Sequence, residues 1–160
     1  MMPPKEPRDT GTVYLAFPIG ESGEEEFERL HATPLPSGGY LIENSPFYAF
    51  DISYRDVARA RHQEGRLLFD GVAERGGHST YRVKLSPEST HEDFLAQFDS
   101  LARLGCSFEG TGSGPRRLYA IDIPPGADLA KVYAPLEALE QQGFWKFEEA
   151  HLFKGHSSGS

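Results

Sequence analysis

The densest group of chemically competent side chains lies at residues 76–82, where the order is Gly-Gly-His-Ser-Thr-Tyr-Arg. An imidazole beside a hydroxyl can supply a general base and a nucleophile. Adjacent strand residues point to opposite faces, so His78 and Ser79 reach one substrate only if the turn breaks this alternation. One hypothesis is therefore a hydrolase centred on His78 with Tyr81, Arg82 and His151. The alternative is that this segment is a hydrogen-bonded turn that feeds a strand.

Arginine side chains form a second candidate group in the first half of the chain. Arg59 and Arg61 share one face of a strand by its period of two, and Arg75 follows the next strand. Forked guanidinium donors can bind a carboxylate or a phosphate, so we predict these three as ligand-binding residues. The competing interpretation is a charged strand edge that prevents aggregation.

The sequence predicts no metal and no cofactor. His31, His78 and His151 are far apart and lack the spacing of metal ligands, and the single Cys106 cannot build a multi-cysteine site. The motifs of serine hydrolases, phosphate loops, dinucleotide sites and zinc proteases are absent.

The charge of the chain favours a basic partner. The 160 residues carry 16 Lys plus Arg and 24 Asp plus Glu, a formal net charge of -8, which repels nucleic acid. Glu24, Glu25 and Glu26 with Phe27 form an acidic segment that we predict as a protein-binding surface. We therefore expect a non-catalytic binding or regulatory protein. It would neutralise a basic toxin or enzyme, or sense a small ligand between its two halves.

Neither a signal peptide nor a membrane span is expected. The first residues lack an apolar core, and no stretch approaches the roughly 20 apolar residues of a span. One cysteine fits a reducing compartment, so we expect a cytoplasmic protein; the sequence leaves its oligomeric state open.

The elements that position these residues divide at about residue 77. Residues 12–77 show short alternating strands and two hairpin turns, at 36–39 and 62–65, which predicts a small antiparallel β barrel or sandwich. Residues 78–153 read β-α-β-β-α-β, with a capping box at Thr90 and a second helix starting after Asp128. That order predicts a ferredoxin-like sheet with two helices on one face. The fold class is thus α+β, the first half covers the other face of the sheet, and residues 1–11 and 154–160 are disordered tails.

Three stretches carry a resemblance to a known family: residues 44–57 (NSPFYAFDISYRDV), 74–83 (ERGGHSTYRV) and 118–124 (LYAIDIP). With their spacing, they resemble a bacterial family catalogued as domain of unknown function 4265, over about Val13 to Leu152. The resemblance implies a two-part bacterial cytosolic protein with a ferredoxin-like second half and no assigned reaction. Pro135 departs from the helix expected in that family and predicts a kink or a shortened helix.

Overall fold

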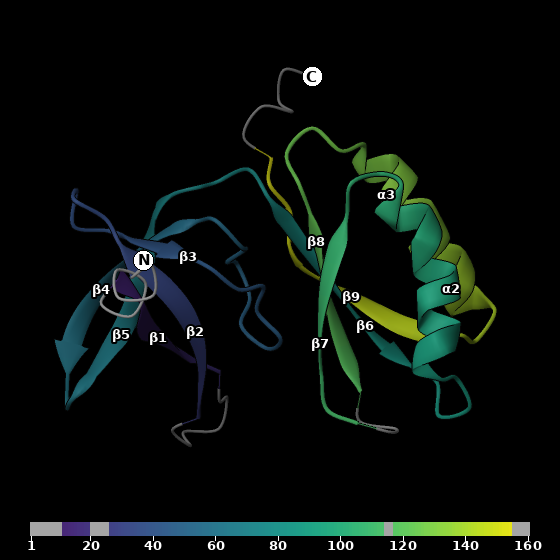
Figure 1. The fold of residues 1–160 in the computed structure, drawn as a ribbon, viewed down its shortest axis with the longest axis horizontal. Helices are drawn as coiled ribbons and strands as arrows, with labels where there is room; N and C mark the ends of the chain where they lie inside the picture. Colours follow the sequence, from purple (N-terminus) through teal and green to yellow (C-terminus); the bar gives the residue numbers. More distant parts are fainter. Residues whose placement is uncertain (1–10, 20–25, 114–116, 155–160) are drawn as a thin grey trace, which may run out of the picture.

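Strands dominate the chain and form two separate sheets (Figure 1). The computed structural model describes residues 11–19, 26–113 and 117–154, and 43% of them are in strands. Within these residues, no helix has the length and apolar character needed to cross a membrane.

The first sheet closes on itself as a five-stranded barrel. Its strands are β1 (Val13–Pro18), β2 (Phe27–Pro34), β3 (Tyr40–Ile42), β4 (Val57–Gln63) and β5 (Arg66–Glu74). Consecutive strands pair antiparallel, and both predicted hairpins are present. The barrel closes through a parallel contact of β1 with β5, at the pair Ala16 and Leu68. Its buried core consists of Leu15, Phe17, Leu30, Ala32, Ile42, Ala49, Ile52 and Ala58.

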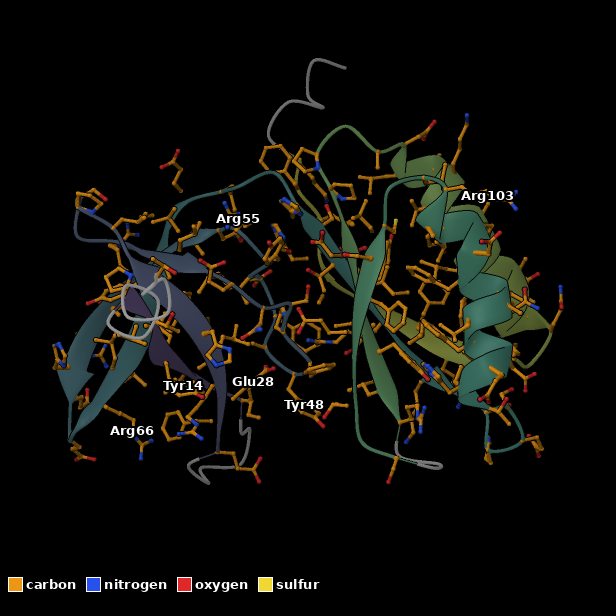
Figure 2. All side chains as sticks on the ribbon, viewed as in Figure 1. Tyr14, Glu28, Tyr48, Arg55, Arg66 and Arg103 are labelled. Atoms are coloured by element: carbon orange, nitrogen blue, oxygen red, sulfur yellow. The ribbon has the colours of Figure 1, made fainter. Side chains whose placement is uncertain are left out.

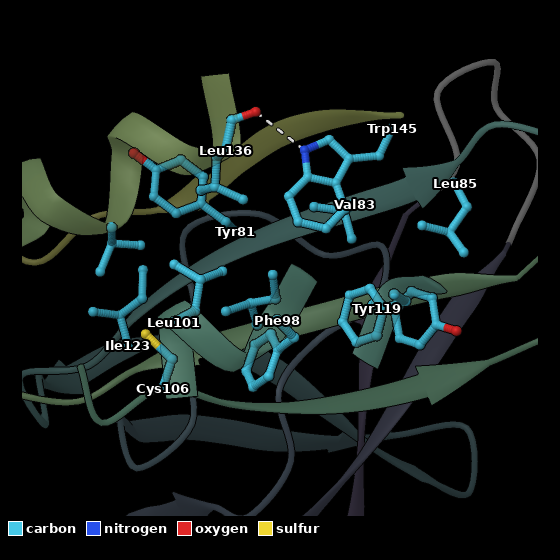
Figure 3. Packing of buried hydrophobic residues seen from close by; sticks show 13 residues of the cluster. Tyr81, Val83, Leu85, Phe98, Leu101, Cys106, Tyr119, Ile123, Leu136 and Trp145 are labelled. Carbon is cyan, nitrogen blue, oxygen red and sulfur yellow. Dashed lines mark hydrogen bonds between the residues drawn. The ribbon is translucent and has the colours of Figure 1, made fainter. Parts of the chain in front are cut away.

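The second sheet has four antiparallel strands in the order β7-β8-β6-β9. They are β6 (Ser79–Leu85), β7 (Ser107–Thr111), β8 (Leu118–Ile123) and β9 (Trp145–His151). Helices α2 (His91–Ala102) and α3 (Leu129–Gln141) cover the face that points away from the barrel (Figure 1). Between helices and sheet lies an aromatic-rich core in which the Trp145 indole donates to the Leu136 carbonyl oxygen at 3.1 Å (Figure 3).

Both helices begin where local capping chemistry predicts. The Thr90 hydroxyl accepts from the Asp93 amide while the Asp93 carboxylate accepts from the Thr90 amide, which is a complete capping box. Asp128 caps α3 through the amides of Ala130 and Lys131. Pro135 lies inside α3 without shortening it, because helical residues continue to Gln141.

The fold class expected from the sequence is corrected by this arrangement. We expected an α+β chain in which an antiparallel barrel or sandwich packs on a ferredoxin-like sheet. The structure is instead mostly β, with a closed barrel that contains a parallel strand pair and a second sheet that carries two helices. Because β1 pairs with β5, the first half closes on itself, and the long loop between β3 and β4, residues 43–56, contacts the second sheet.

Candidate functional site

Loop 43–56 lies between the barrel and the second sheet and is partly buried, so the buried part of its backbone needs hydrogen-bond partners. On the barrel side, Glu28 of β2 accepts from the amides of Phe47, Tyr48 and Ala49 at 2.6, 3.0 and 2.9 Å. Figure 2 shows Glu28 and Tyr48 near each other between the two sheets. A carboxylate that accepts from three amides replaces the turn's own hydrogen bonds and fixes its shape.

On the sheet side, Arg82 of β6 forms hydrogen bonds to the backbone of the same loop. Its side chain is 1% exposed and donates to the Ala49 carbonyl oxygen at 2.7 Å, while its Nε atom donates to Glu148 at 2.8 Å. The ring of Phe50 lies against the guanidinium, 4.6 Å from its carbon. These donors are committed to the fold, so Arg82, one of the residues of the hydrolase hypothesis, is not available to a substrate.

Asp56 organises the end of the loop. Its carboxylate is fully buried and accepts from the amides of Ser53 and Gly76 and from Nη1 of Arg75, each at 2.9 Å. A Cβ atom at Gly76 would lie 2.3 Å from the Arg55 carbonyl oxygen, so only glycine fits beside this carboxylate. Nη1 of Arg75 also donates to a loop carbonyl, and the guanidinium is thereby held in one orientation.

A second buried network joins the loop to the sheet. The Ser53 hydroxyl shares hydrogen bonds with the Thr80 hydroxyl at 2.6 Å and with Nδ1 of His151 at 2.8 Å. Burial lowers the pKa of His151, and the positive charge of Arg75 lowers it further. Ser53 has no exposed surface, so it cannot attack a bound molecule as a nucleophile. With Nδ1 engaged, Nε2 is the His151 ring atom that a ligand could use.

A cavity of about 680 Å³ lies where the loop, the end of β5 and the end of β9 meet. We call it the junction pocket. Arg75 and His151 line it together with two carboxylates, Asp51 and Glu149. The remaining lining residues are Phe50, Ala150, Leu152, Phe153 and Lys154. Cations, anions and aromatic rings therefore face one space.

The residues of the hydrolase hypothesis are not brought together. Nδ1 of His78 lies 2.9 Å from both carboxylate oxygens of Asp122, and burial raises the pKa of this carboxyl although His78 opposes the rise. Tyr81 points into the core under the helices (Figure 3). Burial, with the negative charge of Glu149, raises the pKa of Tyr81 to about 12. Of these residues His151 alone is among those that line the junction pocket.

The three predicted ligand-binding arginines also separate. Arg61 pairs with Asp70 at 3.0 Å, both about half exposed, and Arg59 lies beside Gly71 on the barrel surface. Arg75 alone reaches the junction pocket, because it follows the last barrel strand into the connection with β6.

The predicted acidic surface is described in part. Glu24 and Glu25 lie outside the described residues, and Glu26 is exposed. Phe27 is half-buried, and the Arg66 guanidinium stacks 4.2 Å from its ring centre. Within the described part of the chain, no group of three potential metal ligands forms, and Nδ1 of His31 bonds Asn44 at 3.0 Å.

Sequence reasoning missed the role of the loop and of its carboxylates Glu28, Asp51 and Asp56. One geometric feature marks the loop in the structure: Asp51 and Arg55 adopt positive φ angles of 66° and 74°. Such backbone is costly for residues other than glycine and persists where surrounding contacts hold it. No local pattern in the sequence predicts this backbone conformation, because the contacts that hold the loop come from β2, β6 and β9.

Residues 28–147 match the family described as Domain of unknown function (DUF4265), and the chain belongs to this family. The fold is similar to a crystal structure of a hypothetical protein from Neisseria gonorrhoeae, with a TM-score of 0.72 and 18% sequence identity. The similarity covers 89% of this chain and 94% of that one. At this identity it shows a shared fold alone. The chain has no match among curated proteins.

Proposed function

We propose that this protein is a non-catalytic binding protein that holds a small zwitterionic molecule in the junction pocket. The pocket's volume of about 680 Å³ falls in the range of small-molecule sites, which often lie where two parts of a protein meet. Its walls come from loop 43–56 on one side and from β9 and the residues after it on the other.

The observation that carries this proposal is the fixed guanidinium of Arg75. The side chain is one-third exposed, and its Nη1 atom is tied to the buried Asp56 and to the Asp51 carbonyl oxygen. Arg75 lines the pocket, and a guanidinium already held in one orientation can use its remaining N–H donors at no additional ordering cost. Such a preorganised cation favours a carboxylate.

The opposite charge in the pocket favours an ammonium group on the same molecule. Asp51 and Glu149 both line the pocket and are exposed. Phe50, which is 56% exposed, and Phe153 add aromatic surface for an apolar side chain. A small molecule that carries a carboxylate, an ammonium and an apolar group therefore matches the pocket better than a simple anion does. The dispersal of the hydrolase candidates supports binding without catalysis.

Three matched probes test the proposal by calorimetry: phenylalanine, 3-phenylpropanoate without the amine, and phenethylamine without the carboxylate. We expect phenylalanine to bind most tightly. Arg75→Gln should weaken 3-phenylpropanoate, and Glu149→Gln should weaken phenethylamine, each about tenfold. Arg103→Gln, at the C-cap of α2, serves as the control. Arg75 also pairs with the buried Asp56, so its replacement can prevent folding. In that case Glu149→Gln still tests the proposal, because Glu149 is exposed. Absence of binding for all three probes would refute the proposal.

A further inference from the structure

The outer surface of the barrel carries a second group of charged and aromatic side chains, none of which lines the junction pocket. Leu15 and Phe17 of β1 point into the barrel core, so Tyr14 and Ala16 point outward. Tyr14 is 51% exposed. Its cross-strand partner on β2 is His31, and Ala16 lies opposite Arg29.

Two guanidinium groups on this surface are stacked on aromatic rings. The guanidinium carbon of Arg29 lies 4.8 Å from the ring centre of Tyr14, and that of Arg66 lies 4.2 Å from the ring centre of Phe27. Stacking restrains the guanidinium plane and leaves its N–H edges available for hydrogen bonds. Both groups are therefore held in place before any ligand arrives.

Within the described residues, neither of these arginines has a carboxylate partner. Five of the nine described arginines do, in the pairs Arg55–Glu43, Arg61–Asp70, Arg75–Asp56, Arg82–Glu148 and Arg103–Asp99, whereas Arg59 and Arg117 also form no such pair. What distinguishes Arg29 and Arg66, in a chain of formal net charge -8, is that two arginines without a carboxylate partner among the described residues line the same cavity. Like charges placed close together repel, and an anion bound between them would remove that repulsion.

Both arginines line one cavity of about 440 Å³, which we call the barrel-face pocket. Tyr14 and Phe27 line it as well, with Gly65 of the turn before β5 and Leu67 of β5. Its described lining contains no carboxylate, whereas Asp51 and Glu149 line the junction pocket.

The pocket lies at the seam that closes the barrel. A continued parallel register would place Tyr14 opposite Arg66, but the pairing of β1 with β5 is confined to Ala16 and Leu68. Figure 2 shows Tyr14 and Arg66 at this end of the barrel, with Arg103 at the opposite end of the molecule.

We propose that the barrel-face pocket binds the phosphate monoester of a small molecule. One carboxylate has two oxygens and saturates one guanidinium fork, whereas a phosphate monoester has three terminal oxygens and close to two negative charges, which suit two forks. The volume of about 440 Å³ fits a small molecule.

Calorimetry with the full chain at low ionic strength tests this assignment, using adenosine 5′-monophosphate as the probe. Adenosine and acetate are the comparison ligands, because the first lacks the phosphate and the second offers a carboxylate. We expect the monophosphate to bind, and Arg29→Gln and Arg66→Gln each to weaken it about tenfold or more. Arg66→Lys, which keeps the charge and loses the fork, should weaken it less than Arg66→Gln. Arg103→Gln is the control and should leave binding unchanged.

Several results would overturn the proposal. They are no binding of the monophosphate at millimolar concentration, equal binding by adenosine or acetate, or unchanged affinity in the Arg29→Gln, Arg66→Gln double variant. Binding of a phosphoserine peptide without binding of the monophosphate would also overturn it, because the site would then serve a protein partner. Circular dichroism establishes that each variant is folded. If a glutamine variant does not fold, the comparison of Arg66→Lys with the wild type still decides the test.

Discussion

Individual polar side chains attach the barrel to the second sheet through loop 43–56. Arg82 and Glu28 bond the backbone of loop 43–56 from opposite sides, and Asp56 and Ser53 complete the attachment at its end. No buried side-chain nitrogen or oxygen within the described residues lacks a partner. A buried group that loses its partner bears the full cost of desolvation, so single substitutions here should have large effects.

Replacing Arg82 by methionine should lower the free energy of unfolding by about 2–4 kcal/mol, because the loop carbonyls that accept from it would be buried without a donor. Urea unfolding monitored by far-UV circular dichroism measures the change. The matched control is Arg103→Met, whose arginine is 79% exposed and pairs with Asp99 on the helix surface. It should change stability by less than about 0.5 kcal/mol. Equal effects of the two substitutions would contradict this account.

His151 should make stability depend on pH. Its pKa in the folded protein is below the ordinary value of 6.5. As the pH falls below 6.5, the unfolded chain therefore binds a proton at this histidine that the folded protein does not bind. The free energy of unfolding should therefore decrease between pH 7.5 and 5.5. One proton limits this contribution to about 1.4 kcal/mol per pH unit.

Comparison of the wild type with His151→Gln isolates that contribution. Burial raises the pKa values of Glu109 and Asp122, which stabilises the folded state as the pH falls and opposes the histidine. The subtraction removes these carboxyl groups from the measurement. Chemical unfolding at pH 7.5 and 5.5 should show a smaller decrease in the free energy of unfolding for His151→Gln than for the wild type. Equal decreases in the wild type and the variant would show that the pKa of His151 is the same in the folded and unfolded states.

At the scale of elements, Pro135 is a local conflict that the tertiary structure overrides. It lies in the interior of α3, where it removes one backbone donor, yet Val132 and Leu136 pack the helix on the sheet. Pro135→Ala should restore a hydrogen bond to the Lys131 carbonyl and raise the free energy of unfolding by about 1–3 kcal/mol. Ala138→Gly on the exposed side of α3 is the control and should lower it by about 1 kcal/mol. Urea denaturation that shows Pro135→Ala to be destabilising would mean that the proline is needed for the helix geometry.

The elements that sequence patterns predicted are those whose causes are local. Both helix starts follow from side chains within three residues, Thr90 with Asp93 and Asp128 with Lys131. The hairpin of β4 and β5 follows from the turn that contains Gly65 at a φ of 81°. By contrast, the closure of the barrel joins Ala16 to Leu68, and nothing near either residue in sequence indicates it.

At the scale of the whole molecule, loop 43–56 should make the barrel and the sheet unfold together. The single Trp145 lies in the sheet core and reports on that half, whereas far-UV circular dichroism reports on both halves. Urea transitions from tryptophan fluorescence and circular dichroism should coincide in the wild type.

Glu28→Ala should separate the two transitions, because three loop amides would lose the carboxylate of β2 that accepts from them and the attachment of the barrel to the loop would weaken. Glu137→Ala on the exposed side of α3 should leave them coincident. Two separate transitions in the wild type would mean that the loop does not couple the halves.

The sequence by itself determined the family, the hairpins, the capped helices and the conversion from β structure to alternating β and α elements after residue 77. These depend on periodicity and on interactions between residues that are close in the chain. Only the tertiary structure decided that the first half closes into a barrel and that loop 43–56 joins it to the sheet. It also placed Arg75 with His151 in one pocket and Arg29 with Arg66 in another. Such contacts join residues that are distant in the chain, and a single sequence holds no local signal for them.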